Sequence, residues 1–114
     1  MAHIYLIIDK GNKLAKVGYS SNLASRVILY GGHNPMAVIV DHCATYKTSR
    51  RTVEMTAQQQ LRALGGVPVV AEMTHTVTEW HAFPNNPEVL DKLTTEGLEA
   101  LGLGKRKYKG IFTL

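Results

Sequence analysis

The first thirty residues of the chain hold the side chains that could carry out chemistry. Phenols can orient or deprotonate a water molecule, a guanidinium offers a fixed fork of donors to a phosphate, and a glycine lets a ligand approach the backbone closely. Cleavage of a phosphodiester bond needs these residue types together. The candidates in this stretch are Tyr5, Lys16, Gly18, Tyr19, Arg26 and Tyr30.

Two strands, a tight turn and a short helix are expected to position these residues. The stretch from His3 to Ile8 is rich in Ile, as a largely buried strand is. The turn residues from Asp9 to Asn12 allow Lys13 to Gly18 to return as an antiparallel strand. A helix is predicted from Leu23 to Tyr30, on which the arginine and the last tyrosine lie four residues apart on one face.

A second pair of elements follows. The stretch from Met36 to Tyr46 contains the apolar run MAVIV and predicts the central strand of the sheet. Ser49 is a favourable N-cap for a helix from Arg50 to Leu64. Glu54 lies beside the apolar stripe of this helix, so we expect its carboxylate to lean over the edge of the core toward the sheet.

The remaining apolar segments predict two more strands and a third helix. The strands are expected at Val67 to Ala71 and at Val77 to Phe83. Asn86 is expected to cap a helix with Pro87 at its first position and an apolar side that continues to Leu101. At 114 residues the chain predicts a single domain, residues 1–114, of α/β (α+β) class, with a mixed, mainly antiparallel sheet flanked by helices.

Charge, cysteine content and hydrophobicity indicate the expected partner and compartment of the protein. The net charge of +4 favours a polyanionic partner. The single cysteine, Cys43, cannot form an internal disulfide and fits a reducing compartment. The chain has no signal-peptide pattern and no apolar run near the roughly 20 residues that span a bilayer. These features predict a cytoplasmic protein with no membrane partner.

The basic residues form two blocks that would contact nucleic acid through its phosphates. The alternative is a solvated helix face and a soluble tail. The first block, at the start of the second predicted helix, is Arg50 and Arg51. The second block, near the C-terminus, is Lys105, Arg106, Lys107 and Lys109. The histidines and the cysteine show no zinc-site spacing, and the chain has no phosphate-binding loop of the G-x-x-x-x-G-K-[ST] type.

The motifs resemble those of the GIY-YIG nuclease superfamily over about residues 3 to 83. Tyr5 matches the tyrosine of the first motif, and Gly18 matches the glycine of the second at the usual spacing. The stretch Lys16-Val17-Gly18 is similar to the Lys-Ile-Gly motif of a small stand-alone subgroup found in phages and prokaryotes. Glu79-Trp80 also looks like that subgroup.

The resemblance implies an endonuclease that hydrolyses DNA with Mg²⁺ or Mn²⁺, in the host cytoplasm if the chain is phage-encoded. Glu54 takes the place of the metal-binding glutamate, and Arg26 that of the phosphate-binding arginine. Tyr5 would activate or orient the attacking water if Lys16 or Arg26 favours its phenolate, with Tyr19 and Tyr30 as alternative phenols. RNA is a second substrate class, and a homodimer or a protein partner would supply the target selection that so small a domain lacks.

An alternative function follows from two departures from the family pattern. The second motif lacks its tyrosine, and Gln58 stands where relatives often have a histidine. The alternative is a catalytically inactive GIY-YIG-like module that binds nucleic acid or a protein. Structural roles for the site residues are also open: Glu54 could pair with Arg50 at i, i+4, and Trp80 could belong to the core rather than stack on a base.

Overall fold

The structure is a computed structural model, and it describes residues 2–22, 37–45, 49–103 and 112–113. The predicted helix from Leu23 to Tyr30, with Arg26 and Tyr30, lies outside the described residues. The basic block from Lys105 to Lys109 also lies outside them.

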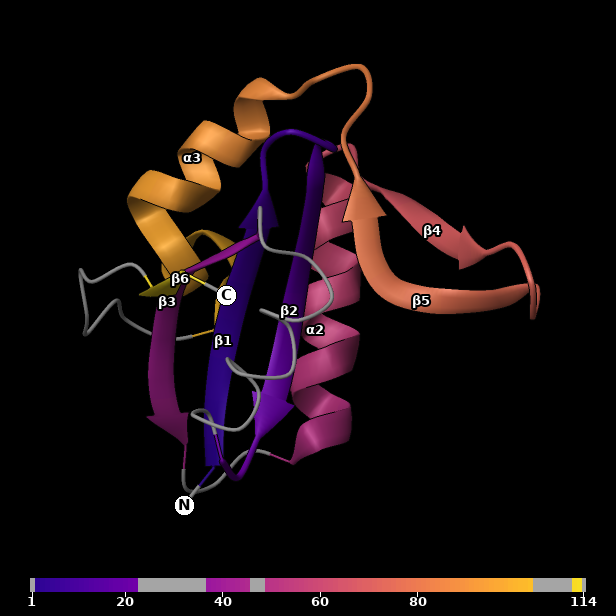
Figure 1. Ribbon diagram of the computed structural model, residues 1–114. Coiled ribbons are helices and arrows are strands. Elements are labelled where there is room, and N and C mark those ends of the chain that lie inside the picture. The colour runs from indigo at the N-terminus through magenta and orange to yellow at the C-terminus, as the bar shows by residue number, and fades with distance from the viewer. Residues whose placement is uncertain (1, 23–36, 46–48, 104–111, 114) are drawn as a thin grey trace.

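The described chain folds around one sheet, in which every described strand pair is antiparallel (Figure 1). The strand order is β4-β5-β2-β1-β3-β6. The predicted class, a mainly antiparallel sheet flanked by helices, is confirmed. The strands are β1 (Ala2–Asp9), β2 (Leu14–Ser20), β3 (Val38–Thr45), β4 (Val67–Ala71), β5 (Thr76–Ala82) and β6 (Phe112–Thr113).

The two strands at the centre of this sheet are β2 and β1, and the prediction that the MAVIV strand is central was wrong. β1 pairs at seven positions with β2 and at seven with β3. β3 has β1 on one side but only the two-residue β6 on the other. The burial of β1 gives the reason, because Ile4 to Ile8 is buried on both faces and its residues are apolar without alternation.

The helix α2 (Arg50–Ala63) confirms the prediction for this segment. The Ser49 hydroxyl accepts a hydrogen bond from the backbone N–H of Thr52 at 3.2 Å, as an N-cap does. Three buried residues, Val53, Ala57 and Leu61, face the sheet.

The third helical segment differs from its prediction at both ends. Asn86 does not cap α3 (Glu88–Glu96); its side-chain amide instead donates to the carbonyl of Leu64, at 2.6 Å. That carbonyl lies at the end of α2, where helical acceptors have no partner within the helix. At the other end, Gly97 has φ 67° and stops the helix, so the apolar side continues in a 3₁₀ helix, η1 (Gly97–Leu101).

The carboxylate of Asp41, on β3, holds η1 against the sheet. It is fully buried and accepts hydrogen bonds from the backbone N–H groups of His42, at 2.9 Å, and Leu98, at 2.8 Å. A Cβ at Gly97 would lie 2.1 Å from the same carboxylate, so only glycine fits between η1 and Asp41.

Apolar side chains fill both faces of the sheet. The larger core lies between the sheet and the helices and takes residues from β1, β2, α2, α3 and η1. The smaller core lies on the opposite face and consists of Tyr5, Ile7, Ala37 and Ile39, with Trp80 packed against it. Across the described ranges, no helix has both the length and the apolar character needed to cross a membrane.

Candidate functional site

Tyr5 and Gly18, the two predicted motif residues, are direct partners across the β1–β2 pair. Tyr5 is only 2% exposed. A Cβ added to Gly18 would lie 2.1 Å from Cζ and 2.3 Å from the hydroxyl oxygen of Tyr5. The close approach that Gly18 allows is therefore the approach of the tyrosine ring, which lies across it.

A cavity opens where β5 leaves β2. The two strands pair only at Leu14 with Ala82 and at Ala15 with His81, after which β5 bends away (Figure 1). We call the space between them the fork cavity; its volume is about 360 Å³. It brings together four of the predicted site residues with three from β5. The lining residues are Tyr5, Lys16, Arg50, Glu54, Thr78, Glu79 and Trp80.

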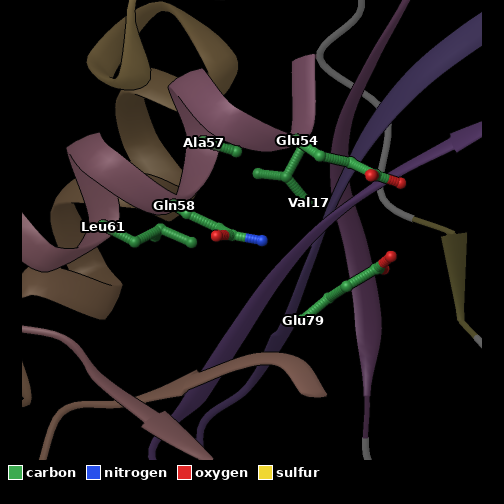
Figure 2. A pocket seen from close by; sticks show the side chains of 6 residues that line it. All are labelled: Val17, Glu54, Ala57, Gln58, Leu61 and Glu79. Atoms are coloured by element: carbon green, nitrogen blue, oxygen red, sulfur yellow. The ribbon is translucent and has the colours of Figure 1, made fainter. Parts of the chain in front are cut away.

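Two carboxylates meet at this cavity. Glu54 comes from α2 and Glu79 from β5, and their side chains extend past Val17 toward the same space (Figure 2). Burial raises the pKa of Glu54, and the negative charge of Glu79 and a hydrogen bond shared with it raise it further. The charges of Arg50 and Lys16 act in the opposite direction. A proton or a cation between the two carboxylates would relieve the repulsion that raises the pKa of Glu54.

Beside this pair lies a much smaller cavity, lined in part by Gln58. Its volume of about 10 Å³ has room for about one water molecule. The Gln58 amide points in the same general direction as the two carboxylates (Figure 2). Because a substrate cannot enter so small a space, the chemistry is expected in the fork cavity.

Lys16 brings a positive charge to the carboxylates. Its ammonium lies 3.4 Å from a carboxylate oxygen of Glu79 and 5.8 Å from the centre of the Trp80 ring. Although charged, Lys16 is only 8% exposed. Strand alternation explains its position, because Ala15 and Val17 on either side belong to the core under the helices. Lys16 consequently faces Tyr5 and Trp80.

Arg50 binds Tyr19 rather than Glu54. Its guanidinium donates to the carbonyl oxygen of Tyr19 at 3.2 Å and lies 5.6 Å from the centre of the Tyr19 ring. Among the described residues, no ion pair joins Arg50 to Glu54. Tyr19 packs against the core under the helices and does not line the fork cavity. Arg51 is exposed and also lies outside the cavity lining.

The sequence did not identify Glu79, Thr78 or Trp80 as site residues. The Glu79-Trp80 pair belongs to the sequence only as part of the resemblance, which leaves Trp80 open between a place in the core and base stacking. In the structure Trp80 packs partly buried against the smaller core and also lines the fork cavity. Glu79 belongs to the site because it contacts Glu54 on α2, and a contact between residues so far apart in the sequence cannot be seen in a local sequence pattern.

The donor set at the cavity restricts which metal ion could bind. Within residues 2–22, 37–45, 49–103 and 112–113, no three His, Cys, Asp or Glu side chains gather as a metal-binding group. Glu54 and Glu79 supply carboxylate oxygens only. Such a donor set fits Mg²⁺, which commonly binds through one or two carboxylates and keeps several water ligands.

The sequence and the structure were compared with known proteins. The chain has no match among protein-family models, among curated proteins or among solved structures.

Proposed function

We propose that the protein is a divalent-metal-dependent endonuclease that hydrolyses phosphodiester bonds of DNA, with the fork cavity as its active site. The observation that carries the proposal is the meeting of Glu54 with Glu79 beside Lys16 and Tyr5 in one cavity. The ordered motifs support it, because the partners Tyr5 and Gly18 and the carboxylate of Glu54 all belong to the GIY-YIG pattern.

Glu54 and Glu79 would hold the metal ion. The negative charge of Glu79 makes ionisation of Glu54 less favourable, and a divalent cation between the two carboxylates would offset that repulsion. When bound, Mg²⁺ or Mn²⁺ supplies positive charge to the non-bridging and leaving oxygens of the phosphate. The cavity leaves room for the water and phosphate ligands that complete the coordination of such an ion.

The other residues would act on the phosphate and on water. Lys16 places its ammonium beside Glu79, where it can neutralise charge that develops on a phosphate oxygen. The Tyr5 phenol would hold the attacking water by a hydrogen bond, at a position fixed by the contact of its ring with Gly18. Arg26, outside the described residues, keeps its predicted role as a phosphate ligand.

Gln58 gives a reason to retain the second candidate function. It lines the small cavity beside Glu54, at the position where members of the GIY-YIG superfamily, which the motifs resemble, often have a histidine. If the missing histidine and tyrosine are essential to the reaction, the protein is an inactive GIY-YIG-like module that binds nucleic acid or a protein partner. The experiment below separates the two functions.

The test is cleavage of supercoiled plasmid DNA with Mg²⁺ or Mn²⁺. Wild type is compared with Glu54→Gln and Glu79→Gln, and with Glu72→Gln as the matched control, because Glu72 is exposed in the turn between β4 and β5. We expect metal-dependent nicking that falls about 100-fold in the two site variants and is unchanged in the control.

Two results would overturn the proposal. Full activity in both Glu54→Gln and Glu79→Gln would remove the fork cavity as the active site. DNA binding by wild type without cleavage under either metal would show that the protein is the inactive binding module and not an endonuclease.

A further inference from the structure

The fork cavity contains an aromatic surface that hydrolysis of a phosphate does not itself require. Trp80 is the only tryptophan in the chain. Part of its indole packs against the smaller core, beside Tyr5 and Ile7, and another part lines the cavity. An aromatic ring that is held in this way and reaches a cavity is a preformed surface on which a nucleobase can stack.

Local hydrogen bonds hold the backbone at Trp80. Its N–H donates to the hydroxyl of Thr78 at 3.2 Å, and that hydroxyl donates to the carbonyl of Val69 at 2.8 Å. These bonds join β5 to β4 where the pairing between the two strands is irregular, between Pro68 and Val70. The backbone that carries the indole is therefore anchored to β4 in the stretch where β5 has left β2.

Lys16 completes the surface with a charge. Its ammonium lies over the Trp80 ring, 5.8 Å from the ring centre, and forms an ion pair of 3.4 Å with Glu79. A base that stacks on this face of the indole must therefore displace the ammonium. A base that stacks on the indole brings its own phosphate with it. The ammonium lies within reach of such a phosphate, and it also borders the two carboxylates of the proposed metal site.

Stacking on the indole selects the form of the nucleic acid. Trp80 is half-buried, so part of its ring is open to a ligand. A base inside a duplex is stacked on its neighbours through both faces and has no face left for the indole, whereas an unpaired or extruded base has. We infer that the fork cavity binds one unpaired nucleobase on Trp80, so that the substrate is DNA with an unpaired nucleotide next to the cleaved phosphate.

This inference rests on the proposed function for the cleavage step, but base binding can be measured without cleavage. Since Trp80 is the only tryptophan, its fluorescence reports on the cavity alone. The protein is titrated without metal with a single-stranded thymidine oligonucleotide, with a duplex of the same length, and with the same strand carrying abasic sites. We expect quenching by the thymidine strand only, and an affinity for it about tenfold higher than for the abasic strand.

Variants at the ring separate stacking from packing. Trp80→Leu keeps apolar volume without an aromatic face, and Trp80→Phe keeps a face. With a labelled strand and fluorescence anisotropy, we expect Trp80→Leu to lose the roughly tenfold preference for bases over abasic sites and Trp80→Phe to keep most of it. Equal quenching by thymidine and abasic strands in wild type would overturn the inference, whether or not the leucine variant folds.

The two proposals can fail separately. Base-dependent quenching with no cleavage under Mg²⁺ or Mn²⁺ would support the stacking site and overturn the endonuclease. Metal-dependent cleavage that is equally fast on duplex and single-stranded DNA, with no base-dependent quenching, would overturn the stacking site and leave the endonuclease.

Discussion

On β2, Ala15 and Val17 face α2 and belong to the larger core, whereas Lys16 and Gly18 face the other way, toward Tyr5 and Trp80. The first face is closed by aliphatic side chains from three helical segments. On the second face, the described residues place the Tyr5 ring across Gly18 at the edge of the smaller core, beside charged groups that contact one another. One strand therefore supplies both the core and the site, because its side chains alternate.

The comparison assigns the stability of the fold mainly to the helix face of β2 and the proposed chemistry to its fork face. Substitutions on the helix face should change the free energy of unfolding through lost burial. Those on the fork face should act through crowding or charge. The four predictions below test this separation, beginning with the largest expected effect.

Leu61→Ala should be the most damaging of the four. Leu61 is 1% exposed and lies in the larger core, so its truncation should lower the free energy of unfolding by about 3 kcal/mol. Urea denaturation measures the loss. Gln60→Ala, at the exposed neighbouring position, should change stability by less than about 0.5 kcal/mol. A similar small change for Leu61→Ala would mean that the helix face is not the main source of stability.

Gly18→Ala tests the packing of the fork face. The new Cβ would overlap the buried ring of Tyr5, and we expect a loss of about 2 kcal/mol by thermal or urea unfolding. Gly11→Ala is the control, because its Cβ would lie at an ordinary 3.5 Å from the Asp9 carboxylate. If both substitutions cost the same, backbone freedom and not the Tyr5 ring would explain the glycine.

The burial of His81 should make the stability of the protein depend on pH. It is fully buried where β5 joins β2, and burial lowers its pKa below 6.5 despite the hydrogen bond with the Glu79 carbonyl. The folded state then binds fewer protons than the unfolded state, so stability is complete above pH 6.5 and falls as the pH drops toward the lowered value. The slope can reach about 1.4 kcal/mol per pH unit for one such group.

Thermal unfolding between pH 7.5 and 5.5 measures this slope. His81→Gln should reduce it, and the remaining slope should include His42, whose pKa burial also lowers. His75→Asn is the control, because His75 is exposed in a turn with φ 54°, a conformation that asparagine tolerates. A slope unchanged by His81→Gln would exclude His81 as its source.

Glu54→Gln should give the smallest effect, and it should be stabilising. Because the pKa of Glu54 is raised in the folded state, wild type loses stability as the pH rises from the ordinary value of 4.5 through the raised one. At neutral pH without metal, the glutamine variant should therefore be more stable by less than about 1 kcal/mol, since the group is only partly buried. Well below pH 4.5 the difference should disappear.

The same unfolding experiment sharpens the metal proposal. Added Mg²⁺ should raise the unfolding temperature of wild type but not of Glu54→Gln. Glu72→Gln, exposed in the β4–β5 turn, should behave as wild type does in both measurements. A Glu54→Gln variant that is less stable than wild type at neutral pH would show that the carboxylates do not repel each other.

Local patterns predicted most of the elements. The first strand and the turn after it follow from an apolar run and from residues that tolerate a tight turn, although the positive φ of 58° falls on Lys13, which was expected in the next strand. α2 follows from its Ser49 cap and apolar spacing, and β4 has the predicted bounds, Val67–Ala71. These elements depend on residues close together in sequence. For that reason one sequence was sufficient to place them.

Contacts between distant residues were not predictable in this way. An apolar run shows that a strand is buried but does not give its position in the sheet, so the centre was assigned to the wrong strand. Asn86 was read as a cap for the helix that follows it, although its amide serves a carbonyl 22 residues earlier. The candidate site was predicted in part, through Tyr5, Lys16, Arg50 and Glu54. Glu79 and the cavity itself depend on how β5 diverges from β2.

The buried carboxylate of Asp41 also has a consequence for the order of folding. One of its hydrogen bonds is to its own strand, but the other is to Leu98, 57 residues further along the chain. Closing so long a loop costs entropy before any contact is gained. We therefore expect α3 and η1 to dock late, after β3 has joined the sheet. Mutations in η1 should then speed unfolding while leaving the refolding rate nearly unchanged.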